Sequence, residues 1–163
     1  MDTRKILGYA LQREHEGKRF FEENAKRLSS AAAVGAFRRL AAEEQQHIVF
    51  IENQIKLLDA GKSPSAEAPA ALEGTGFFTG RAASEKLDQT VLEAMVADLP
   101  VLRTAYLIER DFAEFYETSA KKATGEAQRV LTMLSGWERG HEALFKELHD
   151  KALAQYEQMP WGG

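Results

Sequence analysis

Two Glu-x-x-His motifs are the parts of this sequence best suited to chemistry. They are Glu44-Gln-Gln-His47 and Glu138-Arg-Gly-His141. Residues three apart on a helix project from the same face, so each motif can direct a carboxylate and an imidazole to one point. Carboxylate oxygen together with imidazole suits iron or manganese, and zinc is a further candidate. The motifs therefore predict a metal site, provided that the fold brings them together.

Each motif is preceded by a lone glutamate at nearly the same distance. Glu14 lies 30 residues before Glu44, and Glu109 lies 29 residues before Glu138. Both lone glutamates are followed by five residues, then two aromatic residues, then another glutamate. The sequence therefore contains two copies of one design, each with a lone Glu followed by a Glu-x-x-His motif.

Apolar residues at helical spacing surround all six of these groups. They predict four long helices, which cover residues 3–28, 32–59, 99–120 and 126–156, and a short helix over residues 87–97. The side chain of Asp98 is expected to cap the third long helix, and Gly61 is expected to end the second. Alternating strand patterns are absent, so the predicted class is all-α.

We expect a single domain over residues 1–163, built as a four-helix bundle from two repeated helical hairpins. The predicted parts are a first hairpin over about residues 3–59, a crossover containing the short helix over 61–98, a second hairpin over about 99–156 and a tail over 157–163. The crossover can run the length of a long helix, because an extended residue spans about 3.3 Å. The second and third long helices can therefore run parallel.

The six groups lie on helix faces that are otherwise apolar, so the charges of the four carboxylates would be buried and would need compensation. Four carboxylates buried together without compensation would take up protons. Two divalent cations balance four carboxylates, and two neutral imidazoles complete such a site. One Glu from each of two helices and Glu-x-x-His from the other two is the arrangement of dinuclear carboxylate bundles. The predicted metal ligands are Glu14, Glu44, His47, Glu109, Glu138 and His141.

Neighbouring charged residues are expected to play no part in this site. His15 points away from Glu14 around the helix, and His149 is too far along its helix from Glu138 to share a metal. Glu16, Glu43 and Glu142 are expected to lie on solvated helix faces.

These residues resemble the rubrerythrin-like branch of the ferritin-like di-iron carboxylate superfamily. The resemblance covers about residues 5–58 and 100–155, and it implies a ferritin-like four-helix bundle that holds two iron ions. The implied roles are terminal ligands for Glu14 and Glu109, bridging ligands for Glu44 and Glu138, and one metal each for His47 and His141. Tyr116 matches a position whose hydroxyl can hydrogen-bond a ligand carboxylate.

The sequence departs from that family at three points. It contains no cysteine, so these residues form no rubredoxin module, and electrons are expected from a separate donor. Phe112 stands where rubrerythrins carry an extra carboxylate that lets one iron change ligands. Phe21 stands at the first-hairpin position equivalent to Tyr116. The peroxidase cycle of the family is therefore an open question for this chain.

Three functions are compatible with these observations. The leading one is an oxidoreductase that reduces peroxide or O2 at a di-iron centre. The second is iron handling by a ferroxidase or storage-type protein, and the third is a non-enzymatic bundle with a metal site. A homodimer is also considered, since dimers are common among such proteins.

Composition excludes several other classes. The net charge is −4 with both signs interspersed, which gives no basic face for nucleic acid. The absence of cysteine excludes disulfides, iron–sulfur clusters and thiolate zinc sites within these residues. No segment is long and apolar enough to predict a membrane helix. We expect a cytoplasmic protein.

Overall fold

The computed structural model describes residues 2–67 and 89–160, and these residues form α-helices and no strand. The helices are α1 (Thr3–Asn24), α2 (Ala31–Asp59), α4 (Gln89–Val96), α5 (Leu99–Ala120) and α6 (Gly125–Gln158). The predicted all-α class is confirmed for this part of the chain. The middle of the predicted crossover, residues 68–88, and the last three residues of the predicted tail lie outside the described residues.

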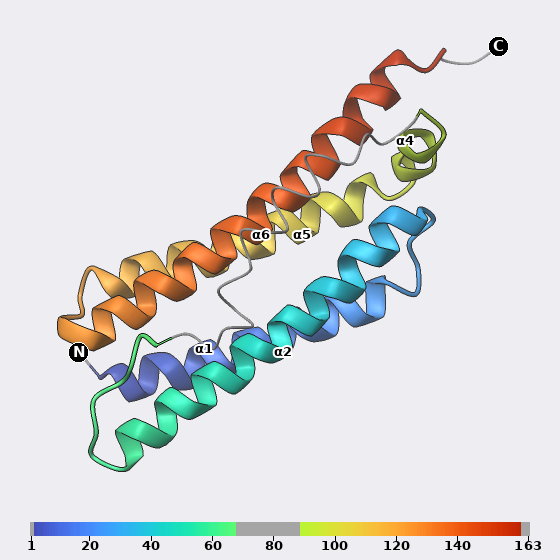
Figure 1. Ribbon diagram of the computed structural model, residues 1–163. Coiled ribbons are helices and arrows are strands. Elements are labelled where there is room, and N and C mark those ends of the chain that lie inside the picture. Colours follow the sequence, from blue (N-terminus) through green and yellow to red (C-terminus); the bar gives the residue numbers. More distant parts are fainter. Residues whose placement is uncertain (1, 68–88, 161–163) are drawn as a thin grey trace.

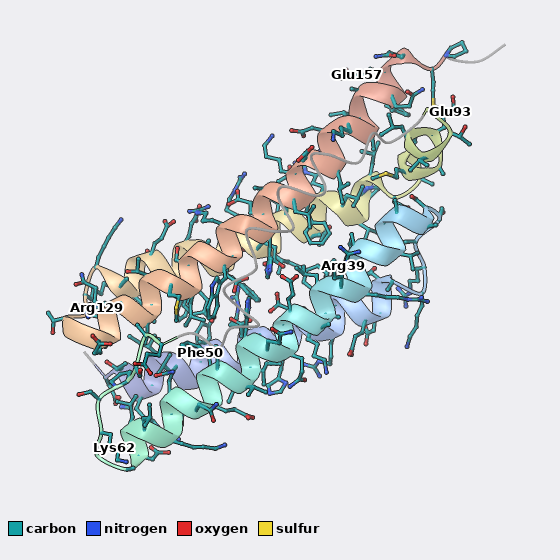
Figure 2. All side chains as sticks on the ribbon, in the orientation of Figure 1. Arg39, Phe50, Lys62, Glu93, Arg129 and Glu157 are labelled. Atoms are coloured by element: carbon teal, nitrogen blue, oxygen red, sulfur yellow. The ribbon has the colours of Figure 1, made fainter. Side chains whose placement is uncertain are left out.

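The long helices are arranged as two pairs (Figure 1). Helix α1 packs along α2, and α5 packs along α6. Helices α2 and α5 run in the same direction, while the short helix α4 lies at one end and packs mainly on α6. Side chains of both pairs fill the space between them (Figure 2). None of the described helices combines the length and apolar character that crossing a membrane requires.

Local sequence accounts for most helix ends. Asp2 caps α1 by accepting a hydrogen bond from the Lys5 N–H at 3.1 Å. Ser30 occupies the same position before α2, and Gly61, with φ of 71°, follows its end. Helix α1 ends at Asn24, so the prediction that it reaches residue 28 is wrong. The reason lies in the backbone, where the Lys26 N–H bonds the carbonyl only three residues back and tightens the chain into a turn.

The prediction that the Asp98 side chain caps α5 is wrong. Asp98 does precede α5, but its side chain makes no capping hydrogen bond to that helix. Its buried carboxylate instead accepts hydrogen bonds from the backbone N–H groups of Ser29 and Ser30, at 2.8 and 2.9 Å. A long-range contact has therefore replaced the local one, and it ties the start of α5 to the turn between α1 and α2.

Two apolar clusters fill the interior. The Phe37 cluster includes Phe21, Phe37, Leu102, Leu144 and Phe145. The Leu131 cluster includes Leu7, Ile51, Tyr116, Leu131 and Leu134. Each long helix contributes to both clusters, and its buried glutamate lies between the two contributions, as Glu14 lies between Leu7 and Phe21 on α1. The fold therefore encloses a polar layer between two apolar ones.

Candidate metal centre

The polar layer contains the six side chains that the repeat predicts as ligands. Helix α1 supplies Glu14, α5 supplies Glu109, and α2 and α6 each supply a Glu-x-x-His motif. Five of the six side chains are fully buried, and His141 is 3% exposed. Helical periodicity explains this placement, because each residue lies on the apolar face of its own helix.

Glu44 and Glu138 lie between the two histidines. The two oxygens of Glu44 lie 3.7 Å from His47 Nδ1 and 3.4 Å from His141 Nδ1. Those of Glu138 lie 3.0 Å and 3.4 Å from the same two nitrogens. Each of these carboxylates therefore presents one oxygen to each histidine.

Glu14 and Glu109 each accompany one histidine. An oxygen of Glu14 lies 3.3 Å from His47 Nδ1, and an oxygen of Glu109 lies 3.4 Å from His141 Nδ1. The cluster thus divides into a Glu14–His47 half and a Glu109–His141 half, with two shared carboxylates between them. The two imidazole rings are stacked, with centroids 5.3 Å apart.

Most polar atoms of this cluster lack hydrogen-bond partners. Among the described residues, the buried side-chain oxygens and nitrogens without a partner all belong to Glu44, His47, Glu109, Glu138 and His141. Of the short distances above, the one between Glu14 and His47 is a hydrogen bond, whereas the others bring the groups close without the alignment of one. Buried polar groups are rarely left unpaired, and such a concentration calls for an ion or another explanation. The donor set therefore fits a bound metal.

Burial raises the pKa of two of the carboxyl groups. It acts first on Glu14, where the charges of Glu138 and Glu44 add to the rise well above the ordinary pKa. Burial and the charge of Glu44 have the same effect on the pKa of Glu109. Both groups accordingly favour the protonated form.

The shared carboxylates have lowered pKa values, whereas the two histidines have raised ones. Burial opposes ionisation of Glu44, but the interactions with the nearby His141 and His47 hold its pKa below the ordinary value. Burial likewise opposes ionisation of Glu138, but the charge of His47 lowers its pKa. Burial disfavours both imidazolium forms, yet the carboxylates around His47 and His141 raise the pKa of each well above normal. These shifts favour the protonated form at Glu14, Glu109 and the two histidines, and the carboxylate form at Glu44 and Glu138.

Tyr116 reaches the cluster from α5. Its hydroxyl donates a hydrogen bond to the Glu14 carboxyl group, and burial followed by the Glu14 charge raises the pKa of the phenol. The equivalent residue of the first hairpin is Phe21, whose ring stacks on Phe145 at a centroid distance of 5.5 Å. A hydroxyl therefore supports only the Glu14–His47 half.

Glu43 contradicts its predicted position on a solvated face. Its side chain is 13% exposed, and Oε2 lies 2.8 Å from His141 Nε2. The sequence did contain a signal for this position. Glu43 lies four residues before His47, so it borders the face of the helix that carries the ligands.

The other charged residues that were expected to play no part in the site do lie away from the cluster. His15 and Glu16 are exposed, Glu142 pairs with two arginines, and His149 contacts Tyr106 and Asp150.

Phe112 borders the cluster where rubrerythrins carry an extra carboxylate. Its ring packs against Gly17 so closely that a Cβ at Gly17 would lie 3.1 Å from Phe112 Cε2. The same added atom would lie 3.9 Å from Glu44 Oε2. The guanidinium of Arg13 covers the ring at 4.6 Å from its centroid. An aromatic ring therefore closes this side of the cluster.

The fold and this cluster define a helical-bundle protein with an interior able to hold metal. Glu44, His47, Glu138 and His141 each offer a ligand atom, and these atoms lie within 4.8 Å of one another. The family model for rubrerythrin matches residues 5–149, so the chain belongs to the rubrerythrin family. This match confirms the resemblance inferred from the motifs. Neither a curated protein nor a solved structure matches the chain.

Proposed function

We propose that this protein holds two iron ions in the buried cluster and uses them to reduce peroxide or O2. The observation that carries the proposal is the arrangement of the carboxylates. Glu44 and Glu138 each present one oxygen to both histidines, while Glu14 and Glu109 each accompany a single histidine. This is the arrangement expected of two bridging and two terminal ligands around two metal ions.

Charge supports the same assignment. Two divalent ions would take the place of the protons that the raised pKa values favour on Glu14, Glu109 and the two histidines, which leaves the total charge of the site unchanged. Iron is the metal of choice because the chain belongs to the rubrerythrin family and the ligands are carboxylate and imidazole. Manganese and zinc fit the same donors, so metal content has to be measured.

When bound, two ferrous ions supply the two electrons that convert peroxide, with two protons, into two waters. The residues of the chain hold and shield this chemistry. The apolar clusters on both sides exclude water, Tyr116 fixes Glu14, and Phe112 covers one flank with a ring that cannot ligate. These residues contain no cysteine for a rubredoxin-type centre, and we propose that a separate donor returns the electrons.

The first test is metal content. Protein purified anaerobically without chelator is expected to contain about two irons per chain, and the Glu44→Ala/Glu138→Ala variant is expected to contain none. A Glu16→Ala/Glu142→Ala variant removes the same charge outside the cluster and should retain the metal. Wild-type protein without metal, in a folded state, would contradict the proposal.

The second test concerns the substrate. The iron-loaded, reduced protein is mixed rapidly with peroxide or with O2, and the absorbance of the oxidised centre is followed. Oxidation by peroxide faster than by O2 supports a peroxidase, and the reverse order supports an oxidase or ferroxidase. No oxidation by either reagent would reject a redox role while leaving the metal site intact.

A further inference from the structure

The two histidines face the cluster in the same way but differ on their outer side. Each directs Nδ1 toward the carboxylates, with the nearest oxygens at 3.0 Å for His47 and at 3.4 Å for His141. Each Nε2 is therefore the atom on the far side of the ring. What this atom contacts is decided by residues other than the six predicted ligands.

A carboxylate contacts His141 on the side of the ring that faces away from the cluster. Glu43 Oε2 lies 2.8 Å from His141 Nε2, and the contact joins α2 to α6 across the two helix pairs. When the ring is neutral and its Nε2 proton is donated to Glu43, the lone pair of Nδ1 faces the cluster. A carboxylate in this position orients an imidazole ligand and raises its basicity.

His47 has no such carboxylate, and it contacts the aromatic ring of a tryptophan instead. Its Nε2 is buried without a hydrogen-bond partner among the described residues. The indole of Trp137 stacks on the imidazole, with centroids 5.0 Å apart and an interplanar angle of 16°. Trp137 follows Glu43 by 94 residues, which is also the separation of Glu44 from Glu138. The repeat therefore places a carboxylate behind one histidine and an indole against the other.

The carboxylate ligands add a second asymmetry. The Tyr116 hydroxyl donates to Glu14, while Phe21 offers Glu109 no such donor. Hydrogen bonding thus supports a histidine in the Glu109–His141 half and a carboxylate in the Glu14–His47 half. The two halves therefore differ in which ligand is supported.

We propose that the two metal positions are unequal, and that Glu43 makes the Glu109–His141 position the tighter one. The inference rests on the dinuclear centre proposed above. Glu43 acts as a positioning residue, because it contacts a ligand and not the metal. Removing such a partner typically weakens metal affinity by about 10- to 100-fold.

The test is a titration of metal-free protein with Co(II), followed by visible absorbance and by competition with a chelating dye. Wild-type protein is expected to bind two ions in steps that differ by about tenfold or more. Glu43→Gln keeps the length of the side chain but removes its charge, and it should weaken the first step by about 10- to 100-fold. The absorption spectrum of the first bound Co(II) should change as well.

Single ligand variants locate the tight ion. His47→Ala is expected to retain it, and His141→Ala is expected to lose it. Glu142→Gln is the matched control, because it removes a charge next to His141 from a carboxylate that pairs with Arg110 and Arg139 instead. It should leave both steps and the Co(II) spectrum unchanged. Thermal unfolding of each metal-free variant verifies that it is folded.

Two results would overturn this inference alone. One is equal affinity of both steps in the wild-type protein, and the other is an equal loss from both steps in Glu43→Gln. Failure of folded wild-type protein to bind Co(II) would instead overturn the dinuclear centre, and this inference with it.

Discussion

The Tyr116 hydroxyl on α5 donates a hydrogen bond to the Glu14 carboxyl group on α1. Both groups are buried, and the bond joins the two helix pairs at the polar layer. Because the equivalent residue of the first hairpin is Phe21, this link has no counterpart in the other half of the cluster. The internal repeat is therefore symmetric in its six predicted ligands and asymmetric in what supports them.

Loss of this hydroxyl should destabilise the protein. Tyr116→Phe leaves a buried carboxyl oxygen without its donor, which costs about 1–3 kcal/mol of unfolding free energy. Urea denaturation of metal-free protein measures the change. Tyr106→Phe is the matched control, because it makes the same substitution on α5 at a ring that packs on His149. Equal effects of the two substitutions would show that the Tyr116–Glu14 bond contributes nothing specific.

Gly17 should tolerate a side chain poorly. A Cβ there would lie 3.1 Å from the Phe112 ring, which Arg13 confines from another side. Gly17→Ala gains helix propensity, but overpacking of this kind costs about 1–3 kcal/mol, so we expect a net loss of about 1 kcal/mol. Gly35→Ala, in α2, meets nothing within 4 Å and should stabilise by about 0.5–1 kcal/mol. Chemical denaturation of both variants tests the pair, and stabilisation by Gly17→Ala would refute the crowding argument.

The stability of metal-free protein should fall as the pH rises above neutrality. Glu14 and Glu109 have folded-state pKa values above their ordinary value of 4.5, and both cluster histidines have pKa values above 6.5. The folded state therefore binds more protons than the unfolded state. This stabilisation is complete below the unfolded pKa of each group and is lost as the pH rises through the folded pKa. Each extra proton contributes a slope of about 1.4 kcal/mol per pH unit.

Urea denaturation in chelator between about pH 6 and pH 9 measures this slope. A Glu14→Gln/Glu109→Gln variant mimics the protonated carboxyl groups and should flatten the slope. The shared carboxylates act below this range, because the pKa values of Glu44 and Glu138 are lowered and their contribution is lost only in acid. A stability that rises with pH in the same range would contradict the assigned protonation states.

Metal binding should release protons. The protonated forms favoured at Glu14, Glu109 and the two cluster histidines must lose their protons when these groups become ligands, so two ions displace about four protons near neutral pH. Calorimetric titration in buffers of different ionisation enthalpy counts them. Glu14→Gln should release one proton fewer. Binding of two ions without proton release would mean that the groups are already deprotonated.

The amino-acid sequence by itself determined the helical class and the six residues that meet in the polar layer. Both follow from a spacing of 3.6 residues per turn, which is a local property: Glu44 and His47 share a face whatever the neighbouring helices do. The repeat then pairs each motif with a lone glutamate. Family membership followed from the same motifs, whereas the role of these residues as metal ligands stays a prediction.

The tertiary structure decided what lies around those residues. Glu43 supports His141 and Trp137 stacks on His47 because of how α2 and α6 are rotated and offset across the bundle. Asp98 reaches Ser29 and Ser30 because the chain returns past the first turn. Periodicity along one helix specifies the face on which a residue lies. It does not specify which side chain of another helix lies opposite, since that depends on packing over the whole core.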